Sequence, residues 1–99
     1  MSSHIIQNIY SIFDKASGIY ERPFTIATDQ LAKRSMVNLL TQKNSMIVDN
    51  PEDFTLFHIA SFDSSSGEMV PNEQPRVVIR FHELVAEIQM IQEARIQEY

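Results

Sequence analysis

Three histidines, His4, His58 and His82, are the residues in this sequence best suited to hold a metal ion or move a proton. Their spacing matches no metal-ligand pattern, because in such patterns pairs of ligands recur a few residues apart. His58 lies in an apolar and aromatic segment, which favours a buried, hydrogen-bonded histidine over a catalytic base. The histidines therefore predict no metal site and no acid–base catalysis.

Acidic residues and serines gather in two short segments, 49–53 and 63–68. Paired catalytic carboxylates need a cleft that separates their pKa values, whereas both segments have turn-forming sequence, where Asp bonds to the local backbone. The serines at 64–66 have no nucleophile-elbow motif around them. The chain has two glycines and no cysteine, which excludes phosphate-binding loops and thiol chemistry. We predict a protein that is not an enzyme and needs no cofactor.

A second group of residues could bind single-stranded DNA, with aromatic rings stacking on bases and cations contacting phosphates. Packing in the core is the other use of these rings, and the one we favour. The net charge of −5, from eight Lys and Arg against thirteen Asp and Glu, has the wrong sign for a protein that neutralises phosphates. It predicts weak or no direct DNA binding. The candidate residues are Tyr10, Tyr20, Phe24, Lys33, Arg34, Arg76 and Arg80.

The length of 99 residues, with 43% hydrophobic and 21% charged residues, predicts one folded domain over residues 1–99. No apolar run approaches the ~20 residues that cross a bilayer. The first residues lack the basic start and apolar stretch of a signal peptide. We therefore expect a soluble intracellular protein without membrane contact.

The first half of the chain predicts a hairpin followed by a helix. Apolar residues over 5–13 indicate a central strand, and Asp14–Gly18 supplies turn residues. The returning strand, 19–27, contains Pro23 and therefore belongs on an edge. A helical period follows Thr28 or Asp29, either of which can cap it, and ends near 42–44. Its apolar face comprises Leu31, Ala32, Ser35, Met36, Leu39 and Leu40.

The second half predicts another hairpin and a C-terminal helix. Residues 45–53 suit a short strand or a packed loop. A strand over 54–62 and a turn over 63–67 lead to a strand at 68–70 that Pro71 stops. Residues 76–81 fit either a strand or the start of a helix. From Phe81 the sequence is helical, with an apolar stripe that could face the sheet or form a protein interface, a homodimer among others: Phe81, Leu84, Val85, Ile88 and Ile91.

Together these segments predict an α+β fold, a small antiparallel sheet of two β-hairpins with one helix between them and a C-terminal helix. Along these segments stand several short motifs, in this order: Ile9–Lys15, Tyr20 with Pro23 and Phe24, Ala32 with Arg34, Pro51–Phe54, Leu56, Ser61–Asp63, and Gly67 with Glu68. Taken together, these motifs resemble the small nonstructural protein of gokushoviruses, single-stranded DNA phages of the Microviridae. The likeness covers about residues 8–75, and residues 76–99 form a mostly helical C-terminal extension beyond it.

This resemblance implies a product made in the infected bacterium, in the host cytoplasm, and absent from the virion. It implies a role in viral single-stranded DNA replication and packaging, and it carries over no catalytic or binding residue. Given the acidic charge, our preferred hypothesis is an adaptor that binds phage replication or assembly proteins. The alternatives are a direct single-stranded DNA-binding protein and an inhibitor of a host protein.

Overall fold

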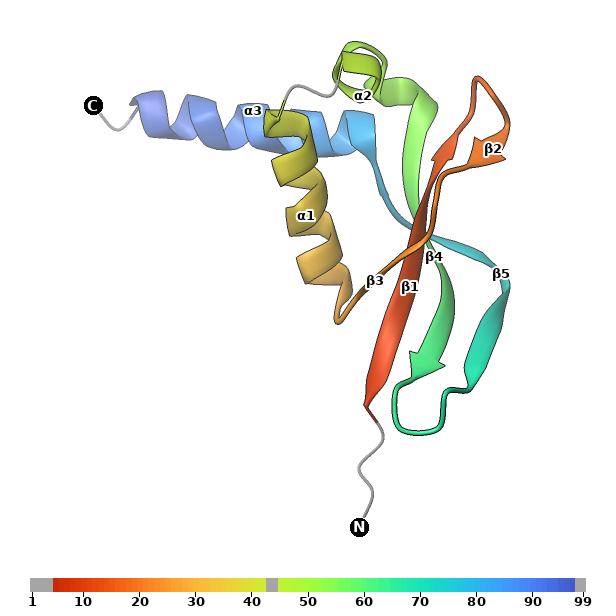
Figure 1. Ribbon diagram of the computed structural model, residues 1–99. Coiled ribbons are helices and arrows are strands. Elements are labelled where there is room, and N and C mark those ends of the chain that lie inside the picture. Colours follow the sequence, from red (N-terminus) through yellow and green to blue (C-terminus); the bar gives the residue numbers. More distant parts are fainter. Residues whose placement is uncertain (1–4, 43–44, 98–99) are drawn as a thin grey trace.

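The computed structural model describes residues 5–42 and 45–97, so His4 and residues 98–99 of the predicted extension lie outside it (Figure 1). One antiparallel sheet and three helices confirm the predicted α+β class. In chain order the elements are β1 (Ile6–Asp14), β2 (Ile19–Tyr20), β3 (Phe24–Ile26), α1 (Asp29–Thr41), α2 (Ser45–Asp49), the 3₁₀ turn η1 (Pro51–Asp53), β4 (Phe54–Asp63), β5 (Met69–Arg80) and α3 (Phe81–Gln97).

Strand β1 is central in the sheet, as its apolar residues on both faces predict. It pairs with β4 on one side and with β2 and β3 on the other, giving the order β2-β1-β4-β5 with β3 also beside β1. Gly18 makes the turn before β2 with a φ of 73°, which a glycine adopts at little cost. Pro23 separates β2 from β3, so the predicted irregular edge strand is confirmed as two short pieces.

Helix α1 begins where its predicted cap lies. The Thr28 hydroxyl accepts a hydrogen bond from the Leu31 amide at 3.2 Å, which satisfies one of the free N–H groups of the first turn. Ala32 and Met36 are buried against the sheet. The prediction that Leu31 shares this face is wrong, because it is 47% exposed. Each residue turns a helix by about 100°, and the contact line along Ala32 and Met36 leaves Leu31 to one side.

Residues 45–53 form α2 and η1, so both structures predicted for them, a short strand and a packed loop, are wrong. Ile47 alone of the three apolar residues at 46–48 is buried, whereas Met46 and Val48 are exposed. Only one residue in this segment therefore enters the core. A helical turn places it there while its two neighbours face outward, and this tertiary contact outweighs the β preference of Ile and Val.

Strand β5 continues past Pro71 and Pro75 to Arg80, so the prediction that Pro71 stops it is wrong. β5 is an edge strand of the sheet, and no strand lies on its outer side to need the N–H group that proline lacks. The pairing moves from Ala60 with Pro71 to His58 with Arg76, so residues 72–75 form an excursion opposite a single residue of β4. Residues 76–80 are strand, and the C-terminal helix begins at Phe81.

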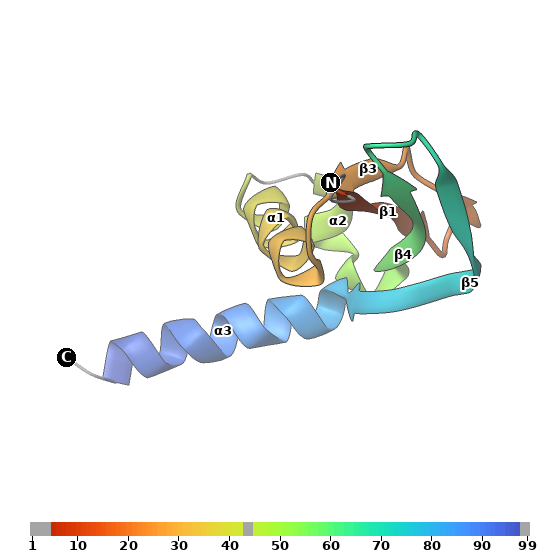
Figure 2. The same cartoon turned by 90° about the horizontal axis from the view of Figure 1, so that it is seen from below.

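All three helices lie on one side of the sheet, and the other side has no helix over it (Figure 2). The core between these layers includes Tyr10, Leu56 and Met36, with Phe81 and Leu84 from the first turn of α3. Helix α3 then passes α1, where Ile88 packs against the core, and its C-terminal part extends past the other elements (Figures 1 and 2). Within residues 5–42 and 45–97, no helix is both long and apolar enough to cross a membrane.

Candidate functional site

A cluster of hydrogen-bonded polar side chains lies between the sheet and α1. Arg76, on β5, holds Asp29 of α1 by two bonds, from Nη1 to Oδ2 at 2.9 Å and from Nη2 to Oδ1 at 3.2 Å. The buried Tyr10 hydroxyl donates to the same Oδ1 at 2.6 Å. Charge-assisted bonds of this kind are the stronger hydrogen bonds in proteins. They fasten the start of α1 to both β1 and β5.

His58 occupies the other half of this cluster. Its Nε2 lies 2.9 Å from Asn8 Oδ1, and its Nδ1 lies 2.8 Å from Asn72 Nδ2. The Asn72 amide nitrogen also donates to the His58 carbonyl at 2.9 Å, which assigns Asn72 as the donor to the ring. The imidazole is therefore assigned as neutral with its proton on Nε2. We call the whole set the polar cluster: Asn8, Tyr10, Asp29, His58, Asn72 and Arg76.

The protonation states in the polar cluster follow from burial and from Arg76. Burial lowers the pKa of His58 below its ordinary value of 6.5, and the charge of Arg76 lowers it further. The hydrogen bond from Arg76 lowers the pKa of Asp29, outweighing the opposing effect of burial. Burial and the neighbouring Asp29 raise the pKa of Tyr10. Near pH 7 the cluster thus holds a neutral imidazole, a charged carboxylate and a neutral phenol.

Within the polar cluster these groups bond mainly to one another. Both ring nitrogens of His58 are occupied, and both oxygens of Asp29 face Arg76. The prediction of a buried, hydrogen-bonded His58 is confirmed. The arrangement ties the 72–75 excursion and α1 to the central strands. Its partners could not be found from the sequence, because they lie 50 residues apart for Asn8 and His58 and 47 apart for Asp29 and Arg76.

We expect the stability of the protein to fall as the pH drops below about 6.5, the ordinary pKa of histidine. Because His58 has a lower pKa in the folded state, the unfolded chain takes up the proton first, and acid favours unfolding in this range. Urea denaturation between about pH 7.5 and pH 5 measures the effect. His58→Gln should flatten the curve, and the exposed-site control His82→Gln should keep its slope. An equal slope in the His58 variant would contradict the assignment.

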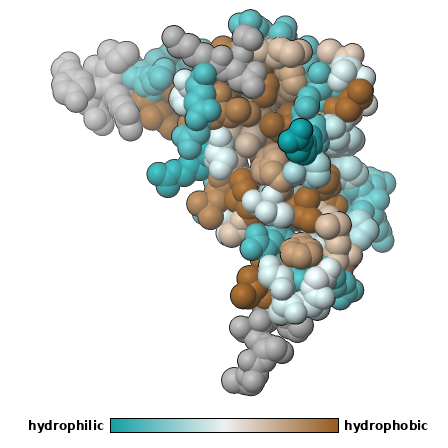
Figure 3. Space-filling model, viewed as in Figure 1, coloured by the Kyte–Doolittle hydropathy of each residue, from teal (hydrophilic) through white to brown (hydrophobic). Residues whose placement is uncertain are grey.

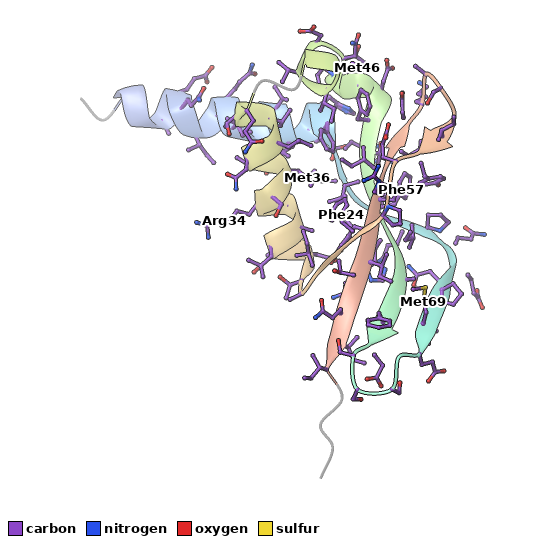
Figure 4. The ribbon with its side chains drawn as sticks, viewed as in Figure 1. Phe24, Arg34, Met36, Met46, Phe57 and Met69 are labelled. Atoms are coloured by element: carbon purple, nitrogen blue, oxygen red, sulfur yellow. The ribbon has the colours of Figure 1, made fainter. Side chains whose placement is uncertain are left out.

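The structure divides the candidate DNA-binding aromatic residues between the two faces of the sheet. Tyr10 is fully buried on the helix side of the sheet, where Phe24 stacks on it with ring centroids 6.1 Å apart. Figure 4 shows Phe24 and Met36 between α1 and β1. Tyr20 instead contacts Phe13 and Phe57, on the opposite side. The prediction of Tyr10 as a base-stacking residue is therefore wrong, because successive strand residues point to opposite faces and Tyr10 points inward.

Three of the four candidate cations form ion pairs. Lys33 pairs with a carboxylate at 2.8 Å, Arg76 at 2.9 Å and Arg80 at 3.6 Å. Arg34 is the exception among the four, since within the described part of the chain it is exposed and forms no ion pair. Figure 4 shows it pointing away from α1. Ion pairing thus leaves Arg34 as the candidate cation without a carboxylate partner among the described residues. The carboxylate partners are Glu87, Asp29 and Glu83, in the same order.

A second aromatic group lies on the face of the sheet turned away from the helices. The ring centroids of Phe13 and Tyr20 are 4.7 Å apart, those of Tyr20 and Phe57 5.7 Å, and those of Phe13 and Phe57 6.2 Å. Tyr20 is 43% exposed, and the other two rings are half-buried. Of the residues predicted to contact DNA, Tyr20 lies in this group. The alternation of side chains along a strand could have placed Phe13 and Phe57 here, because each lies next to a residue that faces the helix side, Ile12 in β1 and His58 in β4. We call this trio the aromatic face.

The candidate protein interface on α3 is only partly available. The predictions of Phe81 and Leu84 as interface residues are wrong, since both are buried in the core of their own chain. Val85 and Ile88 are half-buried, and Ile91 is exposed. Phe81 and Leu84 face the sheet, so of the predicted stripe Val85, Ile88 and Ile91 are left to meet another molecule. Across residues 5–42 and 45–97, no three His, Asp or Glu side chains gather to hold a metal ion.

The sequence matches the model of a known protein family. The model of the family described as Phage ORF5 protein matches residues 7–84, from β1 to the first turn of α3. The chain belongs to the Phage ORF5 protein family. It is therefore a bacteriophage protein. Neither a search of curated proteins nor a search of solved structures found a match.

The ORF5 match contains the whole polar cluster and the whole aromatic face. It ends at Leu84, further along the chain than residue 75, where the resemblance seen in the sequence ended. The matched part of the ORF5 protein therefore includes all of β5 and the two α3 residues that complete the core. Residues 85–97 of α3 lie beyond the match, and among them Ile88 still packs against the core.

Proposed function

We propose that this ORF5-family protein is a nonstructural accessory protein of a gokushovirus, which acts in the host cytoplasm as a protein-binding adaptor in viral single-stranded DNA replication or packaging. The ordered sequence motifs support the viral assignment. The pairing of Lys33, Arg76 and Arg80 with carboxylates is the observation that carries the adaptor role. A protein that binds DNA strongly does so through cations free to replace counterions.

The adaptor's docking surface is the aromatic face. Exposed aromatic rings dominate many protein interfaces, because they bury a large area at a small cost in side-chain entropy. Val77 of β5 is exposed and pairs with Phe57, which extends this surface toward the edge of the sheet. Strand addition at that edge is opposed by Pro71, Pro75 and the excursion between them. The partner is therefore expected to contact side chains of the aromatic face.

Two other functions use the same surface. Single-stranded DNA binding is favoured by Tyr20, which stands exposed beside Phe57 as stacking residues do. Inhibition of a host protein would place a host partner, in place of a phage partner, on the aromatic face. The adaptor, the DNA-binding protein and the host inhibitor differ in the molecule that contacts the aromatic face. Experiments that identify this molecule therefore separate the three functions.

We expect no micromolar binding of labelled single-stranded DNA by the purified protein, measured by fluorescence anisotropy across a salt series. Micromolar binding that weakens steeply with salt and is lost in Tyr20→Ala would overturn the adaptor role. The matched control is Ile19→Ala. Its side chain is also exposed, and it points to the other face because the two residues are neighbours in β2.

A photo-reactive amino acid at position 20 tests the adaptor role in infected cells. A cross-link to a phage replication or assembly protein is expected, and the same probe at the exposed residue Glu52, beside α2, should not give it. Cross-links to a host protein alone would favour the inhibitor, and cross-links to DNA would favour direct binding. Either of these results would contradict the proposed adaptor.

A further inference from the structure

The outer part of α3, residues 89–94, is exposed and has little contact with its own chain. Among the described side chains of α3, Phe81 and Leu84 are buried and Val85 and Ile88 are half-buried, whereas Met90 and Ile91 are 69% and 56% exposed. Both views show this helix extending past the sheet and the other helices (Figures 1 and 2). Short helices without tertiary contacts are marginal in water, so an amphipathic helix of this kind gains stability by covering its apolar residues.

A groove beside this helix offers such a contact. It has a volume of about 310 Å³ and lies between α1 and α3. Val37, Leu84, Ile88 and Ile91 give it an apolar floor. Hydrophobic surface is visible over α1 and on the adjoining part of α3 (Figure 3). The remaining lining residues are polar or charged: Gln30, Lys33, Arg34 and Glu87.

The charges around the groove differ in sign between the two helices. On the α1 side, Arg34 is exposed and forms no ion pair within the described part of the chain. On α3, Glu93 is likewise exposed and unpaired among the residues described. Glu93 shares a helix face with Met90, because residues three apart are neighbours on a helix surface. Among the described residues, each chain thus carries a free cation, Arg34, beside the groove and a free anion, Glu93, on the exposed part of α3.

We propose that the occupant of this groove is α3 of a second copy, and that the protein is a homodimer. In a two-fold arrangement every contact occurs twice, so each chain both fills a groove and has its own groove filled. Met90 and Ile91 of each copy would cover the apolar floor of the other. Arg34 of each copy would pair with Glu93 of the other. Complementary features on the same two elements of one chain favour a second copy over an unrelated partner.

The dimer goes beyond the proposed function and does not depend on it. The groove and the outer part of α3 lie on the helix side of the molecule, whereas the aromatic face lies on the opposite side of the sheet. Pairing through the helices would therefore leave two aromatic faces exposed. The failure of one proposal can be told from the failure of the other, because the dimer is tested with the purified chain alone and the adaptor role needs a partner molecule.

Sedimentation equilibrium of the full chain over a range of concentrations tests the dimer. We expect a monomer–dimer equilibrium in the wild type and a dissociation constant about tenfold or more higher for Met90→Asp, which places a charge in the apolar contact. Met69→Asp is the matched control, since Met69 is 59% exposed at the start of β5, far from the groove, and should leave the equilibrium unchanged (Figure 4). A single-chain mass at every concentration, or equal effects of both substitutions, would overturn the proposal.

Charge reversal tests the ion pair separately from the apolar contact. Arg34→Glu should weaken the dimer, because it places an anion against Glu93 of the partner, and adding Glu93→Arg should restore the wild-type affinity. Both residues are exposed, so the fold is expected to tolerate these changes. Higher salt should weaken the wild-type dimer, because ions screen exposed charges. A double variant that stays as weak as Arg34→Glu would contradict the proposed pairing.

Discussion

Replacing Phe81 by alanine is expected to lower the free energy of unfolding by about 3–5 kcal/mol. Phe81 is fully buried at the junction of β5 and α3, and its ring lies 6.4 Å from that of Phe54. Truncation removes the buried ring and leaves a cavity that the surrounding sheet and helices only partly fill. The measurement is urea denaturation of the purified protein, followed by circular dichroism.

The control for Phe81→Ala is Ile91→Ala on the same helix. Ile91 is 56% exposed, so its truncation should change the stability of the monomer by about 0.5 kcal/mol or less at low protein concentration. If Phe81 served as an interface residue, as the sequence suggested, its truncation would weaken association and leave the monomer stable. Equal stabilities of the two variants would therefore contradict the structure.

Replacing Asp29 by alanine is expected to cost about 2 kcal/mol of stability. Most of this cost comes from the Tyr10 hydroxyl, which donates to Asp29 at 2.6 Å from a fully buried residue and would lose its partner. The bond between Arg76 and Asp29 contributes less, because both side chains are about half exposed and water screens the pair. Thermal or urea denaturation of the variant at neutral pH measures the loss.

A double-mutant cycle separates the two parts of this effect. Once Tyr10→Phe has removed the hydroxyl, Asp29→Ala should cost about 1 kcal/mol or less, the value of an exposed ion pair. Asp29→Asn is the conservative variant, since it keeps an acceptor oxygen for Tyr10 and removes the charge that holds Arg76. Additive losses in the cycle would show that Tyr10 and Asp29 do not interact, contrary to the structure.

The local sequence determined most of the secondary structure of this protein. Thr28 caps α1 because a hydroxyl at that position satisfies a free amide, and Gly18 makes the first turn because it accepts a positive φ. Strand β1 is apolar on both faces because residues on both are buried, and β4 alternates because one of its faces is buried. These features depend on neighbours a few residues apart, which the order of residues specifies directly. The errors at 45–53 and at Pro71 arose where contacts with distant residues or a place on the sheet edge decided the structure.

The functional surfaces, in contrast, were decided by the tertiary structure. Tyr10 and Tyr20 are equivalent aromatic residues in the sequence of the first hairpin, yet one is in the core and the other is on the aromatic face. Their sides depend on where the helices cover the sheet. The polar cluster depends on pairing Asp29 with Arg76 and His58 with Asn8, contacts between residues far apart in the chain. Ion pairs of this kind decide which cations stay free, and they form only after β5 and α1 have packed against the central strands.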